Sequence, residues 1–206
     1  MEQTSNKNII TGFYKQVVRE RKSELIPQYV HEDYIQHSPM GKDGRQCLFE
    51  MVEFLKTLPP VAETDKSPIE HLIEDGNLVV AHLDLHFMGK DIRVIELFRV
   101  QDGKAAEHWD VTEELNTKTK PFIEVEEHVI VNDRQLFLTR LYAKYQVTIH
   151  RIISEGSFTA VHAEAKDGQQ SIALFDIFQF EDRKLAGHWA AKQPVPQELM
   201  HNNGMF

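Results

Sequence analysis

The 206-residue sequence predicts an α+β fold, in which helices are followed by a curled antiparallel sheet and then by a partial repeat of that sheet. Apolar residues recur at helical spacing before residue 60. From Ile69 onward, apolar and polar residues alternate between turn pairs at residues 75–76, 88–89 and 102–103, which is typical of an antiparallel meander. The third observation is a match of the chain to itself, described below.

Three amphipathic helices are expected in the first third of the chain. Their expected N-caps are Ser5, Ser23 and Asp43, and the helices extend to about Val18, Tyr29 and Leu58. Residues 33–37, DYIQH, lie between the second and third helices and are too short for a helix. We expect them to form a short strand.

The internal match aligns residues 69–109 with residues 149–189 without a gap, and each segment ends in His-Trp. Such self-similarity predicts a duplicated structural unit. The second unit has one expected helix, residues 133–145, where the first has three. Asp110 follows the first His-Trp and Ala190 follows the second. Any chemistry is therefore expected in the first unit, which alone has this carboxylate.

Composition excludes several classes of function. The formal charge of -9, without a cluster of Lys or Arg, argues against nucleic acid or an anionic membrane as a partner. The start of the chain has no secretory pattern and no window resembles a membrane span, so we expect a cytoplasmic protein. Cys47 is the single cysteine, which rules out an intrachain disulfide and a cysteine-rich zinc site.

Strand alternation sorts the candidate functional residues of the first unit. His82 shares a face with His86, Glu96 shares a face with Phe98, and His108 shares a face with Asp110 while Trp109 lies opposite. His82 and His108 recur in the second unit as His162 and His188, which favours structural roles for them. Asp110 and His37 occur only in the first unit and are the stronger candidates.

Several motifs together resemble one family. They are DYIQHSP at residues 33–39, the VVAH strand, ELFRVQDGK leading to EHWD, and the closing QPVPQE and NNGMF. This combination is similar to the SnoaL-like polyketide cyclase group of the nuclear transport factor 2 and ketosteroid isomerase superfamily. The resemblance implies a cone-shaped curved sheet with helices in its concave face and a deep apolar pocket. It makes residues 1–115 a complete cone and residues 116–206 a partial, non-catalytic repeat.

The resemblance also implies roles for residues. In the polyketide cyclases of this group, an aspartate is the general acid and base of an aldol closure, without metal or cofactor, and a histidine lies nearby. Asp110, with His108 and His37, matches these roles. The expected substrate-binding residues are His82, Glu96, Phe98, Tyr34 and Trp109. The expected ligand is a small apolar carbonyl compound, and a histidine is the expected donor to the developing enolate oxygen.

Two other classes of function stay open from the sequence. A binding protein of the same fold would hold a ligand without turnover, and a metalloenzyme would use His37, His82 and His108 with a carboxylate. The family pattern is also interrupted, because the QPVP tail follows the second His-Trp rather than the first. We expect the second unit to cover the first sheet within the chain, or to pair with a second chain in a homodimer.

Overall fold

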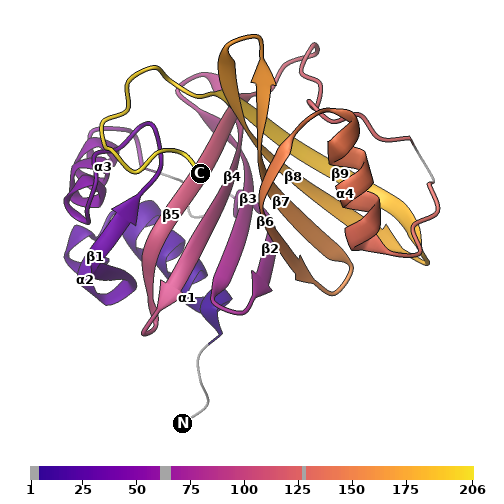
Figure 1. The fold of residues 1–206 in the computed structure, drawn as a ribbon. Helices are drawn as coiled ribbons and strands as arrows, with labels where there is room; N and C mark the ends of the chain where they lie inside the picture. Colours follow the sequence, from indigo (N-terminus) through magenta and orange to yellow (C-terminus); the bar gives the residue numbers. More distant parts are fainter. Residues whose placement is uncertain (1–4, 61–65, 127–128) are drawn as a thin grey trace.

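The computed structural model describes residues 5–60, 66–126 and 129–206 and shows an α+β protein with two sheets (Figure 1). Its helical elements are α1 Asn6–Gly12, η1 Phe13–Arg19, η2 Ser23–Leu25, α2 Ile26–Tyr29, α3 Gln46–Lys56 and α4 Arg134–Lys144. Its strands are β1 Val30–Gln36, β2 Ile69–Asp75, β3 Leu78–Phe87, β4 Lys90–Gln101, β5 Lys104–Glu114, β6 Thr148–Glu155, β7 Phe158–Asp167, β8 Gln170–Glu181 and β9 Lys184–Pro194. The expected order of helices followed by meanders is confirmed.

The first sheet has the strand order β1-β5-β4-β3-β2, with β1 parallel to β5 and the other pairs antiparallel. The second sheet has the order β6-β7-β8-β9 and is antiparallel throughout. It resembles a partial repeat of the first, because equivalent pairs lie 80 positions apart. Glu96 pairs with Asp110 and Asp176 pairs with Ala190, for example. Among the described residues, the second sheet has no strand in the position of β1.

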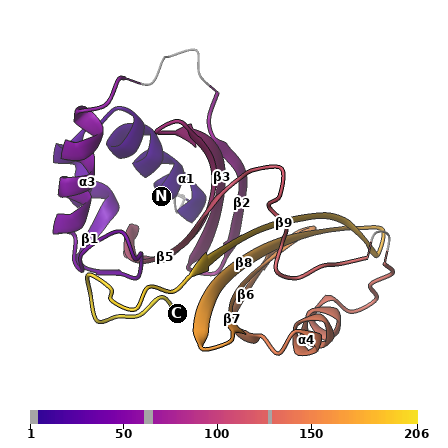
Figure 2. The same cartoon turned by 90° about the horizontal axis from the view of Figure 1, so that it is seen from above.

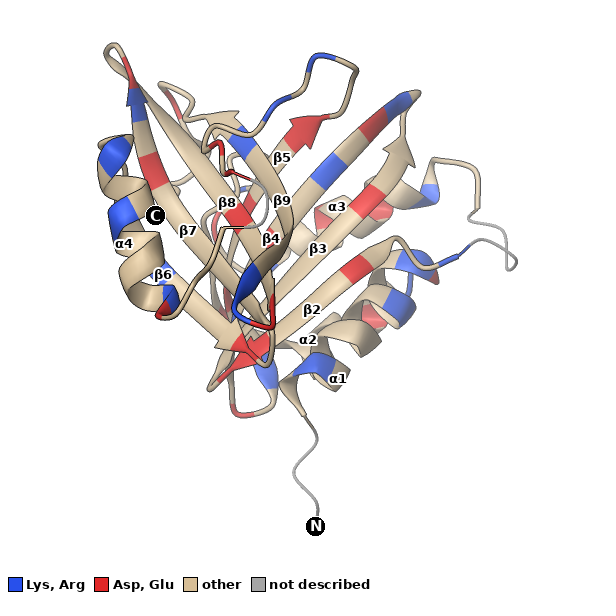
Figure 3. Cartoon of the chain, turned by 90° about the vertical axis from the view of Figure 1, so that its right-hand side faces the viewer, with Lys and Arg blue, Asp and Glu red and all other residues tan. Residues whose placement is uncertain are grey.

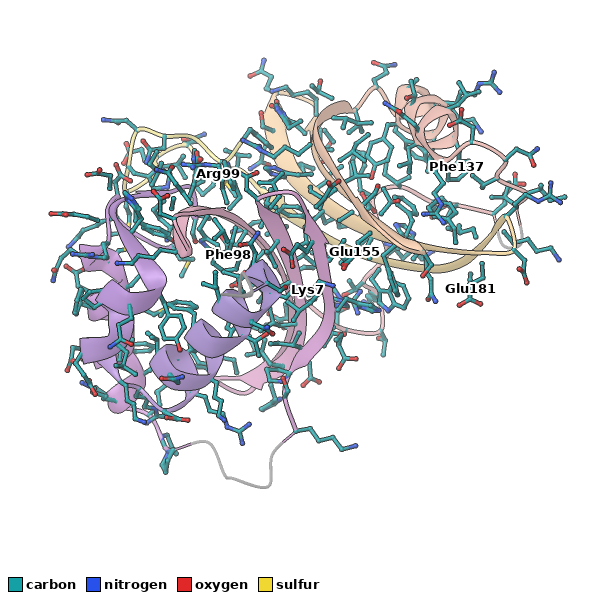
Figure 4. The ribbon with its side chains drawn as sticks, turned by 90° about the horizontal axis from the view of Figure 1, so that it is seen from below. Lys7, Phe98, Arg99, Phe137, Glu155 and Glu181 are labelled. Carbon is teal, nitrogen blue, oxygen red and sulfur yellow. The ribbon has the colours of Figure 1, made fainter. Side chains whose placement is uncertain are left out.

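The two sheets pack face to face, and the helices lie on the outer sides of the pair (Figure 2). The shared core joins Ile73, Val80, Ile95, Leu97, Trp109 and Val111 of the first sheet to Ile153, Ala160, Ala173, Phe175, Ile177 and Ala191 of the second. Each of these side chains is at most 2% exposed. The expectation that the second unit covers the first sheet within the chain is therefore confirmed. At one end of the junction Lys7 forms an ion pair with Glu155 (Figure 4).

The outer faces of the sheets have separate cores. In the first unit, Ile10 of α1 packs on Val79 and Phe98 of the sheet. Phe98 points from the sheet toward the helices (Figure 4). In the second unit, α4 packs Leu138 and Tyr142 on the sheet, so one helix replaces the whole helical layer of the first unit.

All three helix starts differ from those expected, and the second begins at Ser23 itself, with Lys22 in the N-cap position. Ser5 does not cap α1 with its side chain; instead its hydroxyl donates to the Glu74 carboxylate, which also accepts the backbone N–H groups of Asn6 and Lys7. Asp43 accepts the backbone N–H of Gln36, and α3 begins later than expected. At α1, a residue distant in sequence thus accepts the N–H groups that a local cap was expected to accept, whereas local carbonyls of Gly44 and Arg45 accept N–H groups at the start of α3.

The segment after β9, residues 195–206, crosses from the second unit back to the first (Figure 1). Along it, His201 Nε2 donates to the Ser38 carbonyl at 3.0 Å and Asn203 Nδ2 donates to the Gln36 carbonyl at 2.9 Å. Met205 is 2% exposed within the core between the sheets. This closing segment therefore ties the end of β1 to the second sheet.

Deleting residues 197–206 should lower the free energy of unfolding by about 2–4 kcal/mol, because it removes a buried methionine and several buried hydrogen bonds. Urea unfolding of the full and shortened chains measures this difference. Met200→Ala is the control, because Met200 is 56% exposed and its replacement should leave stability unchanged. Equal stability of the shortened and full chains would contradict a structural role for the segment.

Acidic and basic residues are interspersed along both sheets on the side shown in Figure 3. No helix in the described part of the chain is long and apolar enough to cross a membrane.

Candidate active site

Glu96 of β4 and Asp110 of β5 are directly opposed residues on neighbouring strands. They lie on the face of the first sheet that carries the helices, because the Tyr14 hydroxyl of η1 hydrogen-bonds to Glu96. Phe98 and His108 follow on the same face, with their rings 4.6 Å apart. Strand alternation thus brings two carboxyl groups, an imidazole and a phenol together under the helices.

Asp110 is 9% exposed, and Thr112 Oγ1 donates to its Oδ2 at 3.4 Å. Its other oxygen, Oδ1, is buried and has no hydrogen-bond partner among the described residues. Burial raises the pKa of Asp110, and hydrogen bonds from Ser38 and Thr112 offset part of this effect. A buried carboxylate with a raised pKa and an unused oxygen is suited to accept a proton from a ligand.

Glu96 has a pKa raised well above its ordinary value, first by burial and then by the neighbouring charge of Asp110. Two adjacent carboxyl groups in an apolar site do not ionise together without a large free-energy cost, so the pair retains one proton more readily than isolated groups do. The phenol of Tyr14 extends this hydrogen-bonded set. Tyr14 therefore donates its one O–H to Glu96, and a protonated Glu96 has one O–H of its own beside Asp110.

His108 is held in one orientation by Gln36. The Gln36 Oε1 accepts the backbone N–H of Ser38 at 2.9 Å, which identifies it as the oxygen, so His108 Nδ1 donates to it at 2.9 Å. The other ring nitrogen, Nε2, is buried without a hydrogen-bond partner among the described residues, 3.9 Å from Glu96 Oε2. Burial, reinforced by His37, lowers the pKa of His108 to about 3.

His108 is consequently neutral near pH 7, and its free nitrogen is an acceptor. It does not fit the expected role of proton donor to an enolate oxygen, because its one N–H is used by Gln36. The O–H of a protonated Glu96, whose carboxyl group accepts the Tyr14 hydroxyl, fits that role better.

His37 lies on the opposite face of the first sheet. Its ring stacks on Trp109 with centroids 4.7 Å apart, its Nε2 lies 2.9 Å from Glu107 Oε1, and its Nδ1 donates to the Gly204 carbonyl at 2.9 Å. The expected placement of His37 beside the Asp110 carboxylate is therefore corrected. The physical reason is its position just after β1, where the closing segment of the chain reaches it.

His82 also faces the second sheet. It is fully buried, with Nδ1 at 2.9 Å from Nδ1 of His71 and Nε2 at 3.0 Å from Asp84, and burial lowers its pKa to about 4. Trp109 lies in the core between the sheets. Of the expected ligand-binding residues, the structure thus leaves Glu96, Phe98 and Tyr34 near Asp110, and it places His82 and Trp109 on the other face.

Tyr34 is 3% exposed, and its phenol accepts a hydrogen bond from Gln36 Nε2 at 3.4 Å. Its pKa is raised well above its ordinary value by burial, then by Cys47 and Asp110. Tyr14, Gln36 and Ser38 were not among the expected site residues. Gln36 and Ser38 flank His37 in the DYIQHSP motif, so the motif itself was the available signal for them.

The metal alternative is not supported by the geometry. His108 faces the helices, whereas His37 and His82 face the second sheet, so the three histidines of that alternative do not converge. Within residues 5–60, 66–126 and 129–206, no three His, Cys, Asp or Glu side chains form a group able to hold a metal ion.

Two open clefts have volumes of about 190 Å³ and 300 Å³. The smaller is lined by Arg93, Glu113, Leu115, Asn116, Thr119, Pro121, His188 and Ala190, and the larger by Asp75, Arg134, Gln135, Leu138, Ile152, Ser154 and Thr159. Neither is the deep pocket expected under the helices at residues 5–29. Around Asp110 the rings of Phe13, Tyr14 and Phe98 pack on one another at the concave face.

Three solved structures illustrate the likeness of the fold. A candidate polyketide cyclase from Acidithiobacillus ferrooxidans is 22% identical, with 55% of this chain and 92% of that chain covered and a TM-score of 0.42. IdmH from Streptomyces antibioticus is 19% identical, with 53% and 92% covered and a TM-score of 0.41. An NTF2-like protein of unknown function from Cytophaga hutchinsonii is 16% identical, with 55% and 95% covered and a TM-score of 0.43.

No curated protein matches the chain. The model of one family, the SnoaL-like domain, matches residues 10–108, which run from α1 to His108 in β5. This segment contains Tyr14, Gln36, Glu96 and His108 and ends two residues before Asp110. Over residues 10–108, slightly less than half of the chain, the first unit is therefore similar to the SnoaL-like domain, and the second sheet resembles a partial repeat of the first.

Proposed function

We propose that this protein is a cofactor-independent enzyme that transfers protons on a small carbonyl compound, in an aldol-type cyclisation, an isomerisation or a related reaction. The observation that carries the proposal is that Asp110 Oδ1 and His108 Nε2 are two of the four buried side-chain atoms that have no hydrogen-bond partner among the described residues. They belong to residues on the same face of β5. A buried polar atom left unsatisfied by the fold costs about 1–3 kcal/mol, a cost that ligand binding at this site would offset.

The proposed reaction begins with proton abstraction next to the substrate carbonyl. The Asp110 carboxylate accepts the proton, and the electron pair of the broken C–H bond moves into a C=C bond, which places negative charge on the carbonyl oxygen. The O–H of a protonated Glu96 would stabilise that oxygen by hydrogen bonding, and the Tyr14 hydroxyl, which donates to Glu96, would hold this carboxyl group in position. The neutral His108 Nε2 would accept a hydrogen bond from a substrate hydroxyl.

The second half of the reaction depends on the substrate. In an aldol closure, the enolate carbon attacks a second carbonyl of the same molecule, and the new alkoxide takes a proton from Asp110 or Glu96. In an isomerisation, Asp110 returns the proton to another carbon. Each outcome leaves the Asp110–Glu96 pair with its starting number of protons, because one is taken from carbon and one is returned; where Glu96 is the donor, the proton on Asp110 passes to Glu96 to restore the starting state.

The pH dependence of hydrogen exchange on a substrate tests whether Asp110 is the base. Deuterium exchange at the acidic carbon of a β-ketoester, followed by NMR in D₂O, should be catalysed by the protein at a rate that rises with pH as Asp110 ionises. The midpoint of this rise should lie above the ordinary aspartate value of 3.8, because burial raises the pKa of Asp110. Exchange no faster than in protein-free buffer would overturn the proposal.

Tyr14→Phe should lower the exchange rate by about 10-fold, because it removes the hydrogen bond that holds the Glu96 carboxyl group, the proposed donor to the developing oxyanion. Tyr145→Phe is the matched control: its phenol also makes a hydrogen bond, to the Glu124 carbonyl, but it lies in the second unit. Equal rates for Tyr14→Phe and the wild type would remove Tyr14 from the mechanism.

A further inference from the structure

The second unit contains its own set of acid, histidine and tyrosine. Tyr142 of α4 donates from its hydroxyl to Asp176 Oδ2 at 2.7 Å, and His188 Nε2 donates to Asp176 Oδ1 at 2.7 Å. Asp176 and Tyr142 are each 1% exposed. Asp176 and His188 occupy the positions of Glu96 and His108 in the repeat. The histidine is held differently, however, because Asp176 binds the ring nitrogen that is free in His108.

The hydrogen bond to Asp176 fixes the tautomer of His188. Nε2 carries the proton that it donates to the carboxylate, so Nδ1 is left with a lone pair. Nδ1 has no hydrogen-bond partner among the described residues, and the side chain of His188 is 10% exposed. A histidine oriented by a buried carboxylate, with its other nitrogen open, has the arrangement of a general base.

His188 lines the cleft of about 190 Å³ beside β9. Ala190 lines the same cleft and occupies the position of Asp110, so the missing carboxylate leaves room there. At about 30 Å³ for each water molecule, the cleft holds the equivalent of about six waters. This volume suits a compound of roughly six non-hydrogen atoms.

Arg93 enters the cleft from the first sheet. Its Nε and Nη2 donate to the two Asp84 oxygens at 2.8 and 2.7 Å, and its Nη1 donates to the Ala190 carbonyl at 3.3 Å. These three bonds use three of the five guanidinium N–H groups, and the other two have no partner among the described residues. The cleft is therefore lined by a fixed N–H donor, Arg93 of the first unit, and by a histidine with an unused ring nitrogen, His188 of the second unit.

The charges around the cleft favour a neutral ligand. Arg93 is already paired with Asp84. Glu113 accepts the backbone N–H of Lys192 at 3.2 Å, and the charge of Lys192 opposes the rise in the pKa of Glu113 that burial causes. Asp176 hydrogen-bonds to both Tyr142 and His188. Of the described residues that line the cleft, Arg93 is the one with a fixed positive charge, and the Asp84 carboxylate balances it.

We propose that this cleft is a second acid-base site, which binds a small neutral hydroxycarbonyl compound. An N–H group of Arg93 donates to the carbonyl oxygen, and His188 Nδ1 takes a proton from the adjacent carbon. The C–H electron pair becomes the C=C bond of an enolate, whose charge rests on the oxygen beside Arg93. Return of a proton from His188 to carbon reverses the step, so no oxidant or reductant is needed.

Dihydroxyacetone, which has six non-hydrogen atoms, is the probe. In D₂O the full-length protein should catalyse exchange of its carbon-bound hydrogens for deuterium, measured by proton NMR. His188→Gln should lower the catalysed rate by about 10²-fold or more, because the amide keeps a donor to Asp176 but cannot accept the proton. Ala190→Leu should lower the rate similarly by filling the cleft, without removing any charged group.

His86→Gln is the matched control, because His86 is an exposed histidine that also pairs with an aspartate, Asp91, and its replacement should leave exchange unchanged. Exchange that is lost in His188→Gln and Ala190→Leu but kept in His86→Gln assigns the activity to this cleft rather than to the site in the first unit. The proposal is overturned if the wild type gives no exchange above buffer, or if His188→Gln exchanges as fast as the wild type.

Discussion

Removing residues 116–206 should leave a first unit that aggregates or unfolds. The face of the first sheet that lies against the second carries Ile73, Ile95, Leu97, Trp109 and Val111, all at most 2% exposed. Returning each such side chain to water costs roughly 1.5–3 kcal/mol, so a few of them equal the whole stability of a typical domain, about 5–15 kcal/mol. An exposed patch of this kind also promotes association. Size-exclusion chromatography and thermal unfolding of the fragment measure both effects.

Co-expression supplies the control for this truncation. A separate chain of residues 116–206 should restore solubility of the first unit, because it returns the covering sheet without the covalent link. A fragment of residues 1–115 that is monomeric and as stable as the whole chain would instead show that the first unit is an independent domain. In that case the core between the sheets would contribute little to the stability of the chain.

Alternation along the strands predicted much of the candidate site. It placed Glu96, His108 and Asp110 on common faces, and the structure brings these three residues together under the helices. Alternation alone did not indicate which layer covers each face. Both faces of the first sheet are buried, one by helices and one by the second sheet, so His82 was as plausible a pocket residue as Glu96.

The errors arose from contacts between distant parts of the chain. His37 lies beside Trp109 because the parallel pairing of β1 with β5 carries it to the edge of the sheet, where Gly204 accepts its Nδ1 hydrogen. A local sequence pattern does not indicate a hydrogen-bond partner that lies 167 positions away. Tyr14 lies on a helix, and the periodicity of the sequence shows that this helix is amphipathic. The periodicity does not show which strand residue the Tyr14 hydroxyl hydrogen-bonds to. Hydrogen bonds between distant residues depend on how the helices and sheets pack on one another.

The self-match of the sequence predicted more than a fold. It showed that Asp110 has no counterpart, and in the structure the equivalent Ala190 opens onto a cleft. The match could not show that His188 would be held by its other nitrogen, because that depends on Asp176 being one methylene shorter than Glu96 and on Tyr142 of α4. Equal residue types at equal positions thus have different hydrogen bonds in the two units.

Asp110→Asn should abolish proton transfer at the first site and make the protein more stable. Turnover of a β-ketoester should fall by about 10³-fold, because the amide has the shape of the carboxyl group but cannot accept the proton. Ligand affinity should be retained. A protein that binds the ligand without turnover in both forms would support the binding-protein class, and unchanged turnover would remove Asp110 from the mechanism.

The gain in stability follows from the raised pKa of Asp110. A carboxyl group whose folded-state pKa is raised makes the folded protein most stable below the unfolded-state pKa, near 3.8, and that stability is lost as the pH rises through the folded-state pKa. Asp110→Asn has no charge to bury, so its advantage in urea unfolding should grow from pH 4 to pH 7, reaching about 0.5–2 kcal/mol. Asp91→Asn, at an exposed position of β4, should show no such rise. A variant less stable than the wild type at pH 7 would mean that the Asp110 carboxylate stabilises the fold. This result would contradict the inference that burial of the charged Asp110 destabilises the folded protein.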